Sequence, residues 1–118
     1  MTPKTMAETE KHSGTSEQAP IDLVRLDADT RWALQITFAL PERAAVDMHT
    51  LRLTGSLNLL VREGLAEDNP DARRHYRAAY ALLAVKAEDL NDVRAWEHCQ
   101  RLARLARVFA ALYRQRRQ

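Results

Sequence analysis

Apolar residues recur every three or four positions along most of the chain after residue 20, which is the period of an α-helix. Polar links containing proline, asparagine or aspartate divide this pattern into four segments. The pattern predicts an all-α fold, a small bundle of three long helices plus a short N-terminal helix. The expected helices span residues 30–39, 42–65, 70–88 and 92–116.

The first 20 residues differ in composition from the rest of the chain. They contain almost no large apolar side chain and are rich in Thr, Ser, Glu and Lys. Because such a segment buries too little surface to offset its ordering entropy, we expect a disordered or loosely attached tail. Residues 21–118 are expected to form a single helical-bundle domain. It should open with a short apolar segment in a surface groove, made of Ile21, Leu23, Val24 and Leu26.

The ends of the first expected helix are marked by aspartate and proline. Asp27 or Asp29 can cap its start, because a carboxylate accepts hydrogen bonds from the free N–H groups of the first turn. The residue before Pro41 avoids the α-helical region, so the helix should end there. Residues 36–38 also have strand propensity, which leaves an extended segment as the alternative.

The remaining helices have clearer boundaries. Gly64 is a typical C-terminal stop for the second helix. Asn69 and Pro70 begin the third, because asparagine caps a helix and proline suits its first position. Asn91 or Asp92 is expected to cap the last helix.

The expected helix at residues 42–65 has two apolar stripes on nearly opposite faces. One stripe contains Ala44, Met48, Leu51, Gly55 and Leu59. A surface helix normally has a single apolar stripe, so two stripes predict a central helix packed on both sides. One side would meet its own domain and the other a second chain, so that dimerisation completes the bundle. We assign the interface with that chain to the second stripe, which contains Val46, Leu53, Leu57 and Leu60.

Basic residues are concentrated near the C-terminus. The whole chain has a net charge of +2, but residues 1–92 hold 11 basic and 15 acidic residues (−4), and residues 93–118 hold seven arginines and one glutamate (+6). Such a surface is either simply solvated or contacts nucleic acid or another anion. The candidate contacts are Arg94, Arg101, Arg104, Arg107, Arg114, Arg116 and Arg117.

Four aromatic residues fall on the expected helices and offer a third interpretation. On converging helices they can line a pocket for a small ligand, although aromatic residues also simply fill a core. The four are Trp32, Tyr76, Tyr80 and Trp96.

The sequence contains no glycine-rich phosphate loop, no C-x-x-C pair and no H-E-x-x-H motif. His98 and Cys99 are neighbours, and neighbours on a helix diverge by about 100°. Cys99 lies on the apolar face, so we expect a buried thiol rather than a nucleophile. We therefore predict no catalytic residue, metal site or cofactor.

The cysteine count and the apolar runs indicate where the protein is found. A single cysteine excludes an intrachain disulfide and fits a reducing cytoplasm. No apolar run is long enough to span a membrane.

Two stretches resemble a known family. Residues Glu97-His98-Cys99-Gln100-Arg101-Leu102-Ala103-Arg104, followed by Ala110-Ala111-Leu112-Tyr113, look like the end of an uncharacterised family of small all-helical actinobacterial proteins. Residues Leu51-Arg52-Leu53-Thr54-Gly55 to Leu59-Leu60 are similar to its central part. The resemblance covers about residues 40–113 and implies an association with natural-product gene sets or an accessory role. It transfers no catalytic residue, and Glu97 and the basic residues after Tyr113 depart from the family pattern.

These observations together predict a cytoplasmic, non-enzymatic helical protein that acts through protein–protein contacts, as a homodimer or with another protein, in an accessory or regulatory role. The alternatives are a nucleic-acid-binding regulator that uses the C-terminal arginines and a bundle that binds a small ligand. No membrane partner is expected.

Overall fold

The computed structural model describes residues 21–65 and 69–117, and the expected tail at residues 1–20 lies outside them. The described part confirms the all-α prediction. It contains no strand, and its α-helices are α2 (Leu23–Ala33), α3 (Arg43–Val61), α5 (Arg73–Leu83) and α6 (Asp92–Arg117). Single turns of 3-10 helix precede α5 and α6, at Pro70–Ala72 (η1) and Ala87–Asp89 (η2).

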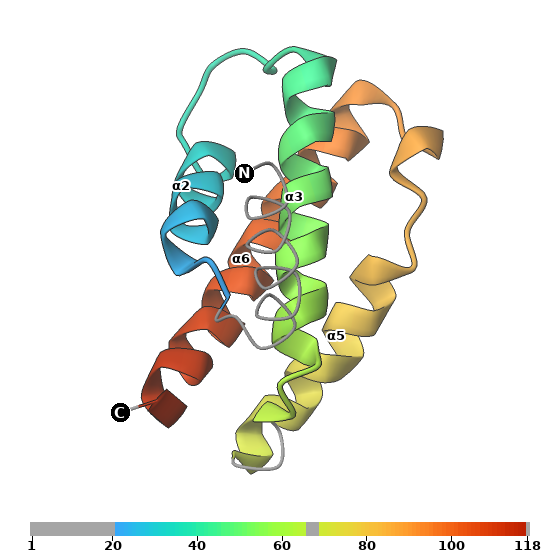
Figure 1. Cartoon of the computed structure of the whole chain (residues 1–118). Coiled ribbons are helices and arrows are strands. Elements are labelled where there is room, and N and C mark those ends of the chain that lie inside the picture. The colour runs from blue at the N-terminus through green and yellow to red at the C-terminus, as the bar shows by residue number, and fades with distance from the viewer. Residues whose placement is uncertain (1–20, 66–68, 118) are drawn as a thin grey trace, which may run out of the picture.

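The longest helix, α6, holds the bundle together. Figure 1 shows α2 and α5 on opposite sides of the molecule, with α3 in front of α6. Helix α6 packs against α2, α3 and α5. Its wide buried face comprises Ala95, Trp96, His98, Cys99, Leu102, Ala103, Leu105, Ala106, Phe109, Ala110 and Tyr113. The core of the chain therefore follows α6 along most of its length.

The first helix begins earlier than the sequence pattern predicts. Residues 23–26, expected to lie as an apolar segment in a groove, form the first turn of α2, and residues 34–42 connect α2 to α3. Asp22 is the cap, because its Oδ1 accepts a hydrogen bond from the backbone N–H of Arg25 at 3.0 Å. Asp27 and Asp29, the two expected caps, both lie within α2, and the side chain of Asp29 is buried. The prediction of a helix at residues 30–39 is therefore wrong.

The predicted signals at other helix ends are present in the structure. Gly64 follows α3 with a φ of 68°, a left-handed conformation that glycine adopts without strain. Asn69 accepts a hydrogen bond from the N–H of Asp71 at 3.0 Å, and Asn91 accepts one from the N–H of Arg94 at 2.8 Å. Asparagine caps therefore begin both η1 and α6.

The structure corrects the assignment of the two stripes on α3. The stripe predicted to meet a second chain is buried in the core of this one, and it consists of Val46, Leu53, Leu57 and Leu60. Positions 46, 53, 57 and 60 repeat at helical spacing, and α3 makes its main contact with α6. Within the described chain α3 is thus packed on one side, and its other apolar stripe faces outward.

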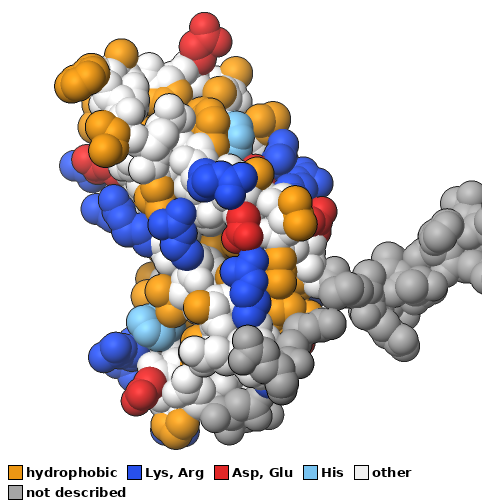
Figure 2. All heavy atoms as spheres, turned by 90° about the vertical axis from the view of Figure 1, so that its left-hand side faces the viewer, with side chains coloured by type: hydrophobic (Ala, Val, Ile, Leu, Met, Phe, Trp, Pro, Cys, Tyr) orange, Lys and Arg blue, Asp and Glu red, His pale blue; other side chains and the backbone are white. Residues whose placement is uncertain are grey.

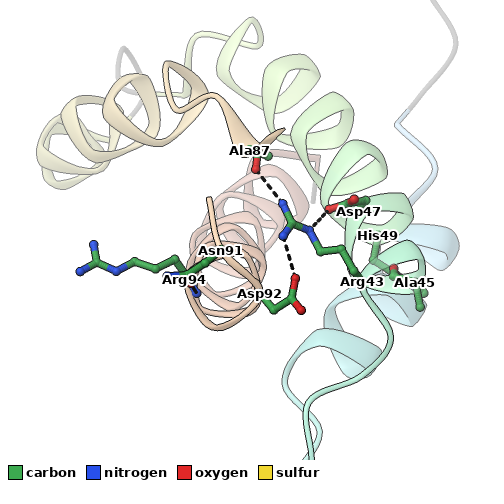
Figure 3. A network of polar contacts seen from close by, with 8 residues as sticks. All are labelled: Arg43, Ala45, Asp47, His49, Ala87, Asn91, Asp92 and Arg94. Atoms are coloured by element: carbon green, nitrogen blue, oxygen red, sulfur yellow. Dashed lines mark hydrogen bonds and ion pairs between the residues drawn. The ribbon is translucent and has the colours of Figure 1, made fainter. Parts of the chain in front are cut away.

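Arg43 fastens the start of α3 to the start of α6. Its Nε donates to Asp47 at 2.8 Å, its Nη1 to Asp92 at 2.9 Å, and its Nη2 to the carbonyl oxygen of Ala87 at 3.0 Å. Figure 3 shows the guanidinium reaching from α3 across to Asp92 and Ala87. The hydrogen bonds to Asp47 and then Asp92 raise the pKa of Arg43 above its ordinary value.

Two valines test whether the stripe of α3 that contains Val46 packs inside its own chain: Val46 itself, and the exposed Val24 of α2 as a control. Val46→Ala should lower the free energy of unfolding by about 2 kcal/mol, because it removes two buried methyl groups and leaves a cavity. Val24→Ala is the matched control, since Val24 is 82% exposed and should change stability by less than about 0.5 kcal/mol. Urea denaturation at several protein concentrations measures both. A Val46→Ala effect that grows with protein concentration would instead place Val46 at an interface between chains.

Candidate functional site

The exposed apolar side chains of the chain gather on one connection and one helix face. Six of the ten large hydrophobic residues that are exposed in the described part lie in these two places. Three belong to the connection between α2 and α3, where Ile36 is 95% exposed, Phe38 is fully exposed and Leu40 is about half exposed. We call these three residues the apolar connection.

The apolar connection has a local cause in the sequence. Its apolar residues alternate at positions 36, 38 and 40, so no helical face can collect them. Pro41 prevents α3 from extending backwards over them. The hydroxyl of Thr37 bonds locally, donating to the carbonyl oxygen of Ala39 at 2.9 Å. The alternation and the proline are visible in the sequence, but we did not predict this exposed cluster from them.

The second exposed group is the outward stripe of α3, which we call the α3 outer stripe. It contains Met48, Leu51, Gly55 and Leu59. Leu51 is 74% exposed, and a methyl group built on Gly55 would meet no atom within 4 Å. A groove of about 410 Å³ runs beside the stripe, between α3 and the start of α2, and is lined by Ile21, Asp22, Arg25, Leu51, Arg52, Gly55, Ser56 and Leu59.

A buried carboxylate fixes α2 against α3 beneath this surface. Asp29 is 1% exposed, and its two oxygens accept hydrogen bonds from Arg52, from Nη2 at 2.9 Å and from Nε at 3.3 Å. This forked pairing suits the planar guanidinium and fixes its orientation. His49 Nε2 lies 4.0 Å from the same carboxylate. Arg52, which lines the groove beside the α3 outer stripe, is therefore held in place by a buried carboxylate.

The four aromatic residues of the predicted ligand pocket do not come together. Trp32 stacks on His49 with ring centroids 3.8 Å apart and meets Trp96 edge-on at 5.4 Å. Tyr76 and Tyr80 lie on α5, where Tyr76 stacks on Phe109 at 5.2 Å. Trp96 and Phe109 are 13 positions apart on one helix, about 20 Å along its axis. The two aromatic pairs therefore pack at different places along α6.

The candidate arginines fall into two groups. Two of the C-terminal ones are engaged within the chain: Arg114 pairs with Asp27 at 2.8 Å, and Arg116 pairs with Glu63. Four others on α6 are exposed, with no ion pair to any described carboxylate: Arg94, Arg101, Arg104 and Arg107. The side chain of Arg117 lies outside the described part. Figure 2 looks onto the α2 side and shows basic side chains between apolar ones, with some acidic side chains beside them.

His98 and Cys99 both lie in the core. Burial lowers the pKa of His98 below its ordinary value, and the nearby charge of Arg101 lowers it further. Burial raises the pKa of Cys99, and a hydrogen bond with Thr50 opposes that effect only in part. The thiol therefore stays protonated and packs as a small apolar group.

Among residues 21–65 and 69–117, no three or more His, Cys, Asp or Glu side chains gather where they could hold a metal ion. None of the described helices has the length and apolar character needed to cross a membrane. No family model, curated protein or solved structure matches the chain.

The buried His98 makes stability depend on pH. Its pKa is lower in the folded than in the unfolded chain, so the unfolded chain binds more protons between the two values. The free energy of unfolding should therefore fall as pH drops from about 6.5, the ordinary histidine value, through the lowered value. His98→Gln should flatten this part of the profile, measured by urea denaturation between about pH 5 and 7.5.

Arg101→Gln is the companion variant for that measurement. It removes the positive charge that lowers the pKa of His98 but leaves the histidine buried, so its pH profile should lie between those of the wild type and His98→Gln. A His98→Gln profile as steep as the wild type would show that His98 does not cause the pH dependence.

Proposed function

We propose that this chain acts through protein–protein contacts, as a non-enzymatic helical module in an accessory or regulatory role. One observation carries the proposal: most of the exposed large apolar side chains of the described chain lie on the apolar connection and the α3 outer stripe. Apolar side chains that are grouped on the surface of a soluble protein commonly mark binding sites, whereas scattered ones need no explanation. The implied link to natural-product gene sets belongs to this proposal, as does a reducing cytoplasm for the buried thiol of Cys99.

Within this proposal, the α3 outer stripe is the homodimer contact. Two copies of α3 can cross antiparallel at Gly55, where the absence of a side chain lets the backbones approach. Leu51 and Leu59 lie four positions on either side of Gly55, so Leu51 of one copy meets Leu59 of the other. Such a two-fold arrangement is self-complementary, as closed dimers require.

Changing both leucines tests the homodimer. Leu51→Asp with Leu59→Asp should convert the protein to a monomer in sedimentation-velocity measurements, because four carboxylates would be buried at the crossing. The fold should survive, since both side chains are exposed. A matched control, Val85→Asp with Val93→Asp, adds the same charge at exposed positions outside the α3 outer stripe and should leave the dimer intact. A wild-type protein that sediments as a monomer at all concentrations would contradict the homodimer.

Nucleic-acid binding is the second candidate, and the exposed arginines of α6 favour it. Arg101, Arg104 and Arg107 lie on one helix and pair with no described carboxylate, so they are free to contact phosphates. The intrachain pairs of Arg114 and Arg116 reduce the number of arginines for this role. Binding of this kind would weaken steeply as the salt concentration rises.

A further inference from the structure

A second apolar groove lies on the other side of the bundle, between α5 and α6. Its volume is about 450 Å³. Most of its lining is apolar and comes from both helices, and we call this apolar part the floor. The floor consists of Ala78, Ala81, Leu82, Leu105 and Val108. Because α5 has 11 residues and α6 has 26, α5 contacts only part of α6. The trough between the two helices is open to solvent.

Arginines line one edge of this groove. Arg101 and Arg104 stand three positions apart on α6, which places them on the same edge about 4.5 Å apart along the helix axis. Neither pairs with a carboxylate of the described residues, whereas Arg43, Arg52 and Arg114 each do. His75 of α5 also lines the groove. The groove is therefore apolar along its floor and positively charged along its α6 edge.

The shape of the groove suits another helix. Residues 101–108 of α6 span about 10 Å, which is two helical turns. Ala78 and Ala81 are small and exposed, so the backbone of an added helix can approach α5 closely. An amphipathic helix with apolar residues at positions i, i+3 or i+4, and i+7 would place them on such a floor.

We propose that the α5–α6 groove binds an acidic amphipathic helix of a partner protein. The apolar face of that helix lies over Leu82, Leu105 and Val108. Asp or Glu residues along one flank of it pair with Arg101 and Arg104. This proposal deepens the proposed function by naming the kind of partner, but it uses a surface separate from α3, so the two can fail independently.

Charge complementarity favours this occupant over the alternatives. A nucleic acid presents phosphates to a broad basic surface, and an apolar floor beside two arginines contributes little to that contact. A small amphiphile has one charged head group for the two arginines, which stand one helical turn apart. A helix can place a carboxylate on every turn and so meet both of them.

Selection from a library of helical peptides, with the full-length protein as bait, tests this proposal. The library holds 14-residue peptides with random residues on one face and both flanks. The enriched peptides should have Leu, Ile or Met at helical spacing and Asp or Glu along one flank. The tightest of them is then titrated by fluorescence anisotropy against the wild type and against Arg101→Glu with Arg104→Glu.

The charge-reversed variant Arg101→Glu with Arg104→Glu should bind the acidic peptide at least about tenfold more weakly than the wild type does. It should bind again when lysines replace the acidic residues on the flank of that peptide. The matched control, Arg31→Glu with Arg107→Glu, changes the same charge at exposed positions outside the groove and should bind within about twofold of the wild type. Ala78→Glu, which places a carboxylate on the groove floor, should also abolish binding.

Three results would overturn the proposal. One is the enrichment of no acidic amphipathic peptide. Another is an enriched peptide that binds the charge-reversed variant and the control variant equally well. The third is tighter binding to duplex DNA or to vesicles of an anionic phospholipid than to the selected peptide, with the same dependence on Arg101 and Arg104.

Discussion

The rest of the structure depends on covering the broad buried face of α6. This helix has 26 residues, whereas α2 and α5 have 11 each and α3 has 19. At 1.5 Å per residue, α6 is about 39 Å long and α5 about 16 Å, so α5 covers less than half of it. The core is therefore closed where α2 and α3 meet α6, and the α5 side keeps an open groove. Arg94, Arg101, Arg104 and Arg107 lie along the exposed remainder of the helix, and two of them line one edge of that groove.

Polar contacts join α2 to α3 and α3 to α6. The fork between Asp29 and Arg52 joins α2 to α3, and Arg43 joins the start of α3 to the start of α6. The Asp29 carboxylate is buried, so losing Arg52 would leave it without its charge partner, and this pair selects one arrangement of α2 against α3. The pair of Arg43 with Asp92 is exposed to solvent and contributes less to stability. The connection between α2 and α3 lies outside the core, with Ile36 and Phe38 in solvent, because its alternating apolar residues and Pro41 allow no helical face there.

Local signals in the sequence were sufficient to predict the fold class and several helix ends. Asn69, Asn91 and Gly64 act through hydrogen bonds or backbone conformation within a few residues, so a sequence pattern can reveal them. The two stripes of α3 were visible as well, but periodicity cannot tell which stripe meets the same chain, and the assignment of Val46 and Leu53 to an interface was wrong. The ion pair between Arg114 and Asp27 joins residues 87 positions apart, and no local pattern predicts such a contact. The groove between α5 and α6 likewise depends on how two helices meet.

Native-state hydrogen exchange tests most directly whether α6 is the helix on which the others depend. Amides between Trp96 and Phe109 should exchange only through global unfolding, with protection equal to the free energy of unfolding from urea denaturation. The amides of α5 should exchange at lower free energy, because α5 contacts α6 over a shorter length and leaves the groove open. Exchange in the centre of α6 that is as fast as in α5 would contradict this account. It would show that the bundle does not depend on α6.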